Sequence, residues 1–184
     1  YDVVKYDIAP AVFTIDMARD LSKAAIVANK NCKIHLAVDT GMGRIGYQVT
    51  EESADEMEQI ASLPNMIVEG IFTHFATADE IDKTKTIQQL QRFQIFVKRV
   101  EEELKISIPM KHCSNSAGIL EMPQANMDAV RAGIILYGLW PSKEVQDEHK
   151  VTLAPALALK TRVVYVKVVP RNTEISYGGT FTTF

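Results

Sequence analysis

The residues best suited to chemistry in this sequence stand where predicted strands end. Four of the five predicted strand ends carry polar side chains: Arg44, His74, Asn115 with Ser116, and Arg131. In a parallel α/β protein the carboxyl ends of the strands lie on one side of the sheet, and ligands bind there. The placement of these residues therefore predicts one shared ligand site.

A phosphate is the ligand that some of these positions favour. Asn115 and Ser116 precede a predicted helix, whose first backbone N–H groups are free to bind an anion. Gly133 and Ile134 follow the last predicted strand and could add their amides to the same site, since glycine lets the backbone approach a ligand closely. Capping of the helix by Asn115 and Ser116 is the simpler interpretation of those two residues, and it stays open.

The stretch from Lys33 to Tyr47, KIHLAVDTGMGRIGY, carries the clearest single signal. Its apolar run predicts a short buried strand. Gly41 and Gly43 then flank Met42, where the backbone must turn tightly or approach a ligand closely. Arg44 projects from that turn and becomes a candidate ligand-binding residue.

Each candidate also has an ordinary structural interpretation when it is taken alone. Arg44 could be a solvated arginine on a loop, His74 a hydrogen-bonded core histidine, and Arg131 the partner of any carboxylate. The functional interpretation therefore depends on their common placement. No two His, Cys or carboxylate side chains share ligand spacing on one element, so no metal site is predicted.

Composition argues against several classes of function. A hydrophobic share of 47%, a charged share of 23% and a net charge of −3 give no electrostatic reason to expect nucleic acid. The apolar stretches are shorter than the ~18–20 residues that cross a bilayer, and the first residues do not form a signal peptide. Cys32 and Cys113 lack metal or redox spacing and are expected to be reduced thiols. We therefore expect an intracellular protein without a nucleic-acid or membrane partner.

Strand-like and helix-like segments alternate along the first part of the chain. The strand-like runs lie at residues 10–14, 34–38, 66–73, 109–113 and 127–132. This alternation predicts α/β architecture with parallel βαβ units. A (β/α)₈ barrel has eight strands and typically about 250 residues, so we expect a partial TIM-type barrel containing the last five strands. The chain starts without methionine and stops within strand-like sequence, and we expect it to be an internal fragment.

The sequence pattern changes near residue 142. Residues 142–149 (SKEVQDEH) are polar and are predicted to link two domains. Beyond them the pattern is strand-like, with Val164, Val166 and Val168 on one face and a turn at residues 170–172. We therefore expect residues 1–148 to form the barrel part and residues 149–184 to begin an all-β domain.

Five motifs resemble the alanine racemase family of pyridoxal-phosphate-dependent bacterial enzymes. They occur in the family's order and extend over nearly the whole chain: VDTGMGRIGY, GIFTHFATADE, HCSNSAGIL, VRAGIILYG and ISYGGTF. The resemblance implies a (β/α)₈ barrel plus a β domain, pyridoxal 5'-phosphate as cofactor, and alanine as substrate. It also implies a cytoplasmic homodimer with shared active sites that supplies D-alanine for peptidoglycan.

The resemblance further implies roles for individual residues. Arg44 would contact the phenolic oxygen of the cofactor and the carboxylate of the substrate. His74 would stack near the pyridine ring and bond to Arg131, which would face the ring nitrogen. Tyr177 would be one of two opposed acid/base groups and would reach into the neighbouring subunit.

The phosphate of the cofactor would be held by the side chains and amides already singled out. By resemblance these are Asn115 and Ser116 together with the amides of Gly133 and Ile134. An arginine at the ring nitrogen cannot give up its proton, so it would leave the ring uncharged and favour racemisation over side reactions.

Two departures from the family pattern qualify this interpretation. The lysine to which the cofactor is covalently attached lies in a motif of the AVVKANAYGHG type, which this chain lacks, so we expect the chain alone to be inactive. Many members also have a carbamylated lysine where this chain has Ala37. The alternatives are a serine or broad-specificity amino-acid racemase, and a catalytically silent barrel-type binding module.

Overall fold

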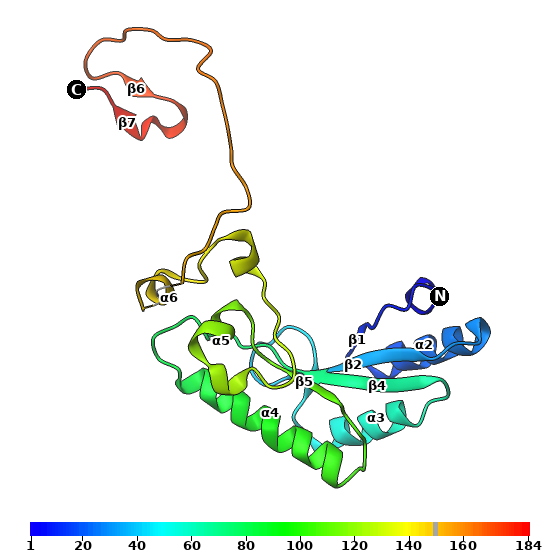
Figure 1. Ribbon diagram of the computed structural model, residues 1–184. Helices are drawn as coiled ribbons and strands as arrows, with labels where there is room; N and C mark the ends of the chain where they lie inside the picture. Colours follow the sequence, from blue (N-terminus) through cyan, green and yellow to red (C-terminus); the bar gives the residue numbers. More distant parts are fainter. Residues whose placement is uncertain (149–150) are drawn as a thin grey trace.

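The computed structural model describes residues 1–148 and 151–184 (Figure 1). Its main sheet is parallel, in the order β1-β2-β4-β5, and β3 pairs separately with β2. The strands are β1 (Ala11–Val12), β2 (Cys32–Asp39), β3 (Tyr47–Gln48), β4 (Met66–Phe72) and β5 (Met110–His112). The strands follow one another across the sheet in chain order, as in a partial TIM-type barrel, and the sheet does not close within the described residues.

Helices α2 (Ile15–Ala28), α3 (Glu51–Ala61) and α4 (Thr84–Glu102) connect the strands and cover one face of the sheet (Figure 1). Helix α1 (Asp2–Lys5) precedes β1, whereas α5 (Ser116–Glu121) and α6 (Lys143–Glu148) follow β5. Short 3₁₀ turns lie at Pro123–Ala125, Ile134–Tyr137 and Tyr177–Gly179. Thr14 and Thr50 cap α2 and α3, because each hydroxyl accepts a bond from the amide three residues later at 3.2 Å.

The core lies between the sheet and α2, α3 and α4. Ile34 and Leu36 of β2 and Ile71 of β4 are fully buried, as are Met57 of α3 and Phe93 of α4. Burying each such side chain contributes roughly 1.5–3 kcal/mol. These contacts hold the strands in register and so fix the positions of the loops at their carboxyl ends.

The predicted strand at residues 127–132 is not formed. Met127 has a φ of 43°, which interrupts an extended backbone, and the side chain of Asp128 accepts a bond from the Lys111 amide at 2.8 Å. Only isolated backbone bonds join this run to the β5 region, from Asp128 N to Lys111 O and from Arg131 N to Ser114 O. The run nevertheless passes beside β5 and delivers Arg131 to the end of the sheet.

The predicted linker at residues 142–149 contains helix α6. Ser142 caps it by accepting from the Val145 amide at 3.2 Å, and the same hydroxyl donates to the Asp79 carbonyl at 3.1 Å. Val145 is buried. This polar run therefore packs against the barrel part, apart from His149, which lies outside the described residues.

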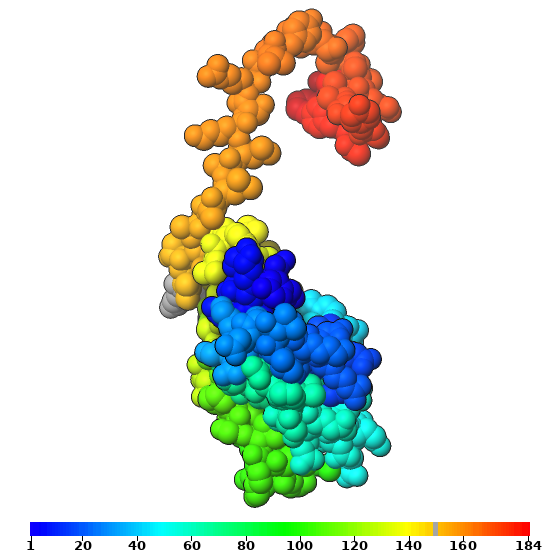
Figure 2. All heavy atoms as spheres, turned by 90° about the vertical axis from the view of Figure 1, so that its right-hand side faces the viewer, coloured from blue at the N-terminus to red at the C-terminus, as the bar shows by residue number. Residues whose placement is uncertain are grey.

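The C-terminal segment leaves the body of the molecule as an extended chain (Figure 2). The predicted strand at 163–168 has no hydrogen-bonded partner among the described residues, and Val168 is 99% exposed. A single strand without a partner is not stable in water, which explains the missing strand. The expected turn at 170–172 is present and leads into an antiparallel pair, β6 (Glu174–Ile175) and β7 (Phe181–Thr182). No helix in the described ranges is long and apolar enough to span a membrane.

Candidate active site

A concave pocket of about 320 Å³ lies at the carboxyl ends of β4 and β5. Its lining includes most of the residues expected from the strand-end pattern. The lining residues are His74, Asp79, Asn115, Ser116, Ala117, Arg131, Gly133, Ile134 and Pro141. Segments up to 67 residues apart in sequence, His74 and Pro141, thus meet in one site at the ends of the parallel strands.

Arg131 is the most densely bonded residue of the pocket. Its guanidinium donates to His112 Nδ1 at 2.6 Å and to the Thr73 carbonyl at 2.7 Å, with a longer contact to His74 Nδ1 at 3.3 Å. It also lies over the Phe72 ring, 5.1 Å from its centroid. These partners are all uncharged acceptors or a ring face, and burial lowers the pKa of Arg131. Its positive charge is therefore fixed in place without a carboxylate among the described contacts.

His74 lies beside Arg131 at the end of β4. Burial lowers the pKa of His74, and the charges of Arg131 and Arg44 lower it further. A neutral histidine facing a guanidinium must accept through the facing nitrogen, so Nδ1 carries the lone pair and Nε2 the proton. His74 is only partly buried and lines the pocket, so it is not a core histidine.

The expected phosphate cradle is partly engaged in bonds within the protein. Asn115 caps α5, accepting from the Gly118 amide at 2.9 Å and donating to the Phe75 carbonyl at 3.2 Å. Ser116 Oγ accepts from the Gly133 amide at 2.9 Å. Since Oγ is an acceptor there, the Ser116 hydroxyl proton remains available to a ligand oxygen. The capping interpretation thus holds for Asn115, whereas Ser116 is oriented by the loop that carries Gly133.

Arg44 is presented by a turn that Asp39 organises. Asp39 Oδ1 accepts from the amides of Gly41, Met42 and Gly43 at 2.9, 2.9 and 3.1 Å. Burial alone would raise the pKa of Asp39, but these three bonds outweigh it and the pKa is lowered. Gly41 and Gly43 have φ of 143° and 68°, values that glycine adopts readily.

Arg44 is exposed and does not belong to the described lining of the pocket. Its charge acts on both His74 and Arg131, which places it within electrostatic reach of the pocket. Among the described residues, no side-chain hydrogen bond or ion pair holds it. Ala37, where many family members have a carbamylated lysine, is buried and carries no charge that could do so.

Gln89 of α4 joins the loops that carry Arg44 and His74. It is buried, accepts from the Ala76 amide at 2.9 Å, and donates to the His74 carbonyl at 3.0 Å and to Thr40 Oγ1 at 3.4 Å. Thr40 and Thr73 also share a hydroxyl bond of 2.8 Å at the ends of β2 and β4. These bonds fix the loops that carry Arg44 and His74 relative to each other.

Tyr177 is not part of this pocket. It lies in the 3₁₀ turn Tyr177–Gly179 and its side chain is fully exposed. Figure 1 shows that turn within the C-terminal hairpin, well away from the parallel sheet. The chain therefore does not bring Tyr177 to its own strand ends.

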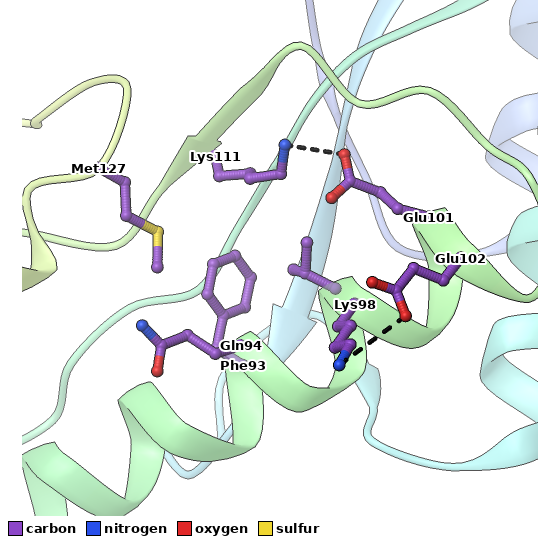
Figure 3. Close-up of a pocket in the computed structure, with 8 residues that line it drawn as sticks. Phe93, Gln94, Lys98, Glu101, Glu102, Lys111 and Met127 are labelled. Atoms are coloured by element: carbon purple, nitrogen blue, oxygen red, sulfur yellow. Dashed lines mark ion pairs between the residues drawn. The ribbon is translucent and has the colours of Figure 1, made fainter.

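A second hollow, of about 220 Å³, lies over α4 (Figure 3). Phe93 and Met127 form part of its lining, and its charges are paired within the protein, Lys111 with Glu101 at 2.8 Å and Lys98 with Glu102 at 3.8 Å. Its lining includes none of the predicted site residues. Within the described parts of the chain, no group of three or more His, Cys, Asp or Glu side chains could hold a metal ion.

Three residues that support the site were not predicted from the sequence: Gln89, His112, and His35, whose Nδ1 lies 2.8 Å from His112 Nε2. His112 stands at a strand end just as His74 does, so the same pattern could have identified it. His35 interrupts an apolar strand, which is a weaker signal. Gln89 is one of several glutamines on α4, and no local pattern separates it from its exposed neighbours.

Comparison with known proteins decides the family. Residues 1–141 match the family described as "Alanine racemase, N-terminal domain". The chain belongs to the alanine racemase family. A curated alanine racemase from Desulforamulus reducens is 46% identical over 181 residues, which cover 98% of this chain and 48% of that protein. The chain thus spans about half the length of the curated relatives it matches.

Solved structures agree with the family assignment. The alanine racemase of Clostridium difficile matches with a TM-score of 0.86 and 37% identity, over 99% of this chain and 47% of that one. A histidine racemase from Leuconostoc mesenteroides matches with a TM-score of 0.80 and 26% identity, over 98% of this chain and 48% of that one. These matches extend over the extended C-terminal segment as well as the parallel sheet. The expected family and the partial barrel are confirmed.

Proposed function

We propose that the protein containing this chain is a pyridoxal-phosphate-dependent racemase that interconverts L- and D-alanine. The observation that carries the proposal is the Arg131 guanidinium, held beside His74 in a strand-end pocket without a neutralising carboxylate among its described contacts. A fixed cation at this position suits an aromatic ligand with a ring nitrogen and an anionic group. Membership in the alanine racemase family supports the same ligand.

The residues present fit pyridoxal 5'-phosphate. The pocket volume falls within the usual range for small-ligand sites, roughly 300–1,000 Å³. A Cβ added at Gly133 would meet only Ser116 Oγ, at 3.7 Å, so the glycine leaves open space where an anion could approach the backbone. We propose that Ser116, Asn115 and the amides of Gly133 and Ile134 hold the phosphate, with the Gly133 amide exchanging its bond to Ser116 Oγ for one to the anion.

The proposed roles of the charged residues follow from their donor chemistry. When bound, the cofactor withdraws electrons from the amino acid and makes its Cα proton acidic. Arg131 can only donate, so it would bond the ring nitrogen while leaving that nitrogen unprotonated. His74, whose pKa is lowered by burial and then by its two cationic neighbours, would lie over the ring without adding charge. Arg44, which is exposed, would bind the carboxylate of the substrate and the phenolic oxygen of the cofactor.

Racemisation requires a base on each face of the substrate Cα. We propose that Tyr177 provides one of them in the neighbouring subunit of a homodimer, because it does not line the pocket of its own chain and the hairpin that carries it lies away from the parallel sheet (Figure 1). The second base would be the cofactor-binding lysine of the full-length protein. The barrel part at residues 1–148 and the β domain from residue 149 would then contribute to different sites.

The experiment is a racemase assay of the full-length protein with its cofactor. L-alanine should be converted to an equal mixture of enantiomers, measured by chiral chromatography. Subunits carrying Tyr177→Phe, mixed with subunits lacking the lysine, should regain part of the activity because one hybrid site has both bases. Tyr165→Phe is the matched control on the same segment and should retain activity without mixing. Full activity in the Tyr177→Phe homodimer would show that Tyr177 is not a base. Mixtures that exchange subunits and stay as inactive as either parent would contradict the shared site.

A different amino-acid substrate is the second candidate. The histidine racemase of Leuconostoc mesenteroides shares the fold over 98% of this chain, so the fold alone does not fix the side chain that is accepted. Initial rates with alanine, serine and histidine at equal concentration separate the candidates. We expect alanine to be preferred, which would make the protein a cytoplasmic source of D-alanine for peptidoglycan. A catalytically silent binding module would bind the cofactor yet leave all three amino acids unchanged.

A further inference from the structure

Arg131 is the last member of a row of bonded side chains that crosses the sheet. His112 on β5 accepts from Arg131 through Nδ1 at 2.6 Å, and its Nε2 lies 2.8 Å from His35 Nδ1 on β2. His35 Nε2 in turn lies 3.5 Å from a carboxylate oxygen of Glu69 on β4. The row therefore links three strands to the pocket.

The donors in this row all point in one direction. Arginine can only donate, so His112 Nδ1 must carry a lone pair and the ring proton must be on Nε2. That proton is donated to His35 Nδ1, which places the proton of neutral His35 on its own Nε2, facing Glu69. The order of donation is thus Arg131 to His112 to His35 to Glu69, and the tautomer of each ring follows from the one before it.

Gly70 makes the bond between His112 and His35 possible. β4 lies between β2 and β5, so the rings of His35 and His112 must meet above it. A Cβ on Gly70 would lie 2.5 Å from His35 Nδ1 and 2.9 Å from the Met110 carbonyl, closer than real Cβ contacts allow. The absence of a side chain at Gly70 therefore leaves the space in which the two histidines touch.

A β-bulge in β4 positions Glu69 at the end of the row. Ile34 pairs with Val68 and His35 pairs with Gly70, so Glu69 is an extra residue without a partner on β2. Bulges re-aim side chains, and here Glu69 reaches His35 as well as Lys33, which donates to it at 2.6 Å. Phe72 completes the arrangement, because its ring stacks on His112 with centroids 5.1 Å apart.

We propose that Glu69, His35 and His112 form a hydrogen-bond relay that fixes the Arg131 guanidinium in the pocket. Glu69 and His35 are then positioning residues for the proposed racemase, and the meaning of the relay for catalysis rests on that proposed function. The burial of His112 supports the relay, because its side chain is only 7% exposed and water does not compete for the ring nitrogens. Burial, Arg131 and His35 lower the pKa of His112 to about 4, which keeps the ring neutral as the relay requires.

The test uses the full-length, cofactor-loaded protein with ¹⁵N-labelled histidine. Ring N–H groups that are bonded and protected from water give observable proton–nitrogen signals. The relay predicts two such signals, from His112 and His35. Gly70→Ala should remove the His112 signal although it deletes no titratable group. His35→Phe should remove both signals and keeps a ring of similar volume. This variant tests the relay if Gly70→Ala fails to fold.

Lys33→Met is the matched control, because Lys33 is the other partner of Glu69 and lies outside the relay. It should leave both signals and the activity unchanged. In Gly70→Ala and His35→Phe we expect kcat to fall about tenfold with KM within about twofold, the size of one positioning hydrogen bond. His35→Asn, whose amide oxygen can replace Nδ1 as acceptor, should recover most of kcat.

The outcomes separate the relay from the proposed function. A His112 signal that survives in Gly70→Ala, or its loss in Lys33→Met, would overturn the relay. Both signals present in a protein without racemase activity would support the relay and refute the proposed function. Racemase activity in a protein that lacks both signals would support the proposed function and refute the relay.

Discussion

Arg131 is held by geometry as much as by charge. Its two terminal nitrogens bond His112 Nδ1 and the Thr73 carbonyl at the same time. Lysine keeps the charge but has a single ammonium group and lacks the planar fork that matches such a pair of acceptors. This difference gives a prediction about stability that does not depend on catalysis.

Arg131→Lys should destabilise the full-length protein by about 1–3 kcal/mol, because a buried acceptor loses its donor. Urea unfolding measures the change. Arg19→Lys is the matched control, since Arg19 is half exposed and bonds only Asp16 on its own helix. Equal effects of the two substitutions would show that the Arg131 contacts contribute no stability.

The lowered pKa values of His112 and His74 predict how the stability of the fold depends on pH. The pKa of His112 is lowered from 6.5 to about 4, mainly by burial and then by Arg131, and that of His74 is lowered too. Above pH 6.5 the histidine side chains are neutral in both the folded and the unfolded chain, and their full contribution to stability is present. Between pH 6.5 and 4 the unfolded chain binds protons that the fold does not, so stability should fall by about 1.4 kcal/mol per pH unit for His112. Urea unfolding of His112→Gln should show a shallower slope, and an unchanged slope would contradict this assignment.

At the scale of elements, α4 fixes the distance between two site loops through one side chain. Gln89→Ala removes the bonds to Ala76, His74 and Thr40 and leaves two partly buried backbone groups without this partner. We expect a stability loss of about 2 kcal/mol and at least a tenfold loss of racemase activity. Gln91→Ala, exposed on the same helix, should change neither. Full activity in Gln89→Ala would show that the loops hold themselves in place.

Sequence patterns predicted the elements wherever local rules decide them. The apolar run around Ile34 forms the expected buried strand. The run at 127–132 was wrong as a strand, because Met127 adopts a positive φ that no pattern announces. The strand at 163–168 also failed, since pairing depends on a partner and not on the residues alone.

The strand-end pattern accounts for only part of the pocket. His74 follows β4, whereas Arg131 reaches the same end of the sheet on a run that passes beside β5 without forming a strand. The contact between His35 and His112 could not be predicted, because it depends on the bulge at Glu69 and on the missing side chain of Gly70. Register across a sheet is a property of three strands together, and a single stretch of sequence does not contain it.

At the scale of the molecule, none of the described residues that line the pocket is a lysine to which a cofactor could be attached covalently. We therefore expect the 184-residue chain alone to show no racemase activity. Borohydride treatment with pyridoxal phosphate should leave no adduct on a specific lysine, as measured by mass spectrometry, whereas the full-length protein should give one. A single stoichiometric adduct on the isolated chain would contradict this expectation.

The extended C-terminal segment has a consequence for the behaviour of the isolated chain in solution. Val164, Val166 and Val168 are almost fully exposed and alternate as in a strand, which is the pattern of a self-associating edge. Between residues 151 and 173 the only charged side chains are Lys160, Arg162, Lys167 and Arg171. Four like charges oppose the stacking of copies, and salt weakens that repulsion.

Aggregation of the isolated chain should therefore rise with ionic strength. Light scattering should increase as the screening length falls from about 30 Å at 0.01 M salt to about 3 Å at 1 M. Val166→Lys should suppress the increase, because it adds a fifth positive charge within the alternating run. Val27→Lys, a similarly exposed position on α2, should not. Equal suppression by both would show that net charge, and not this segment, governs solubility.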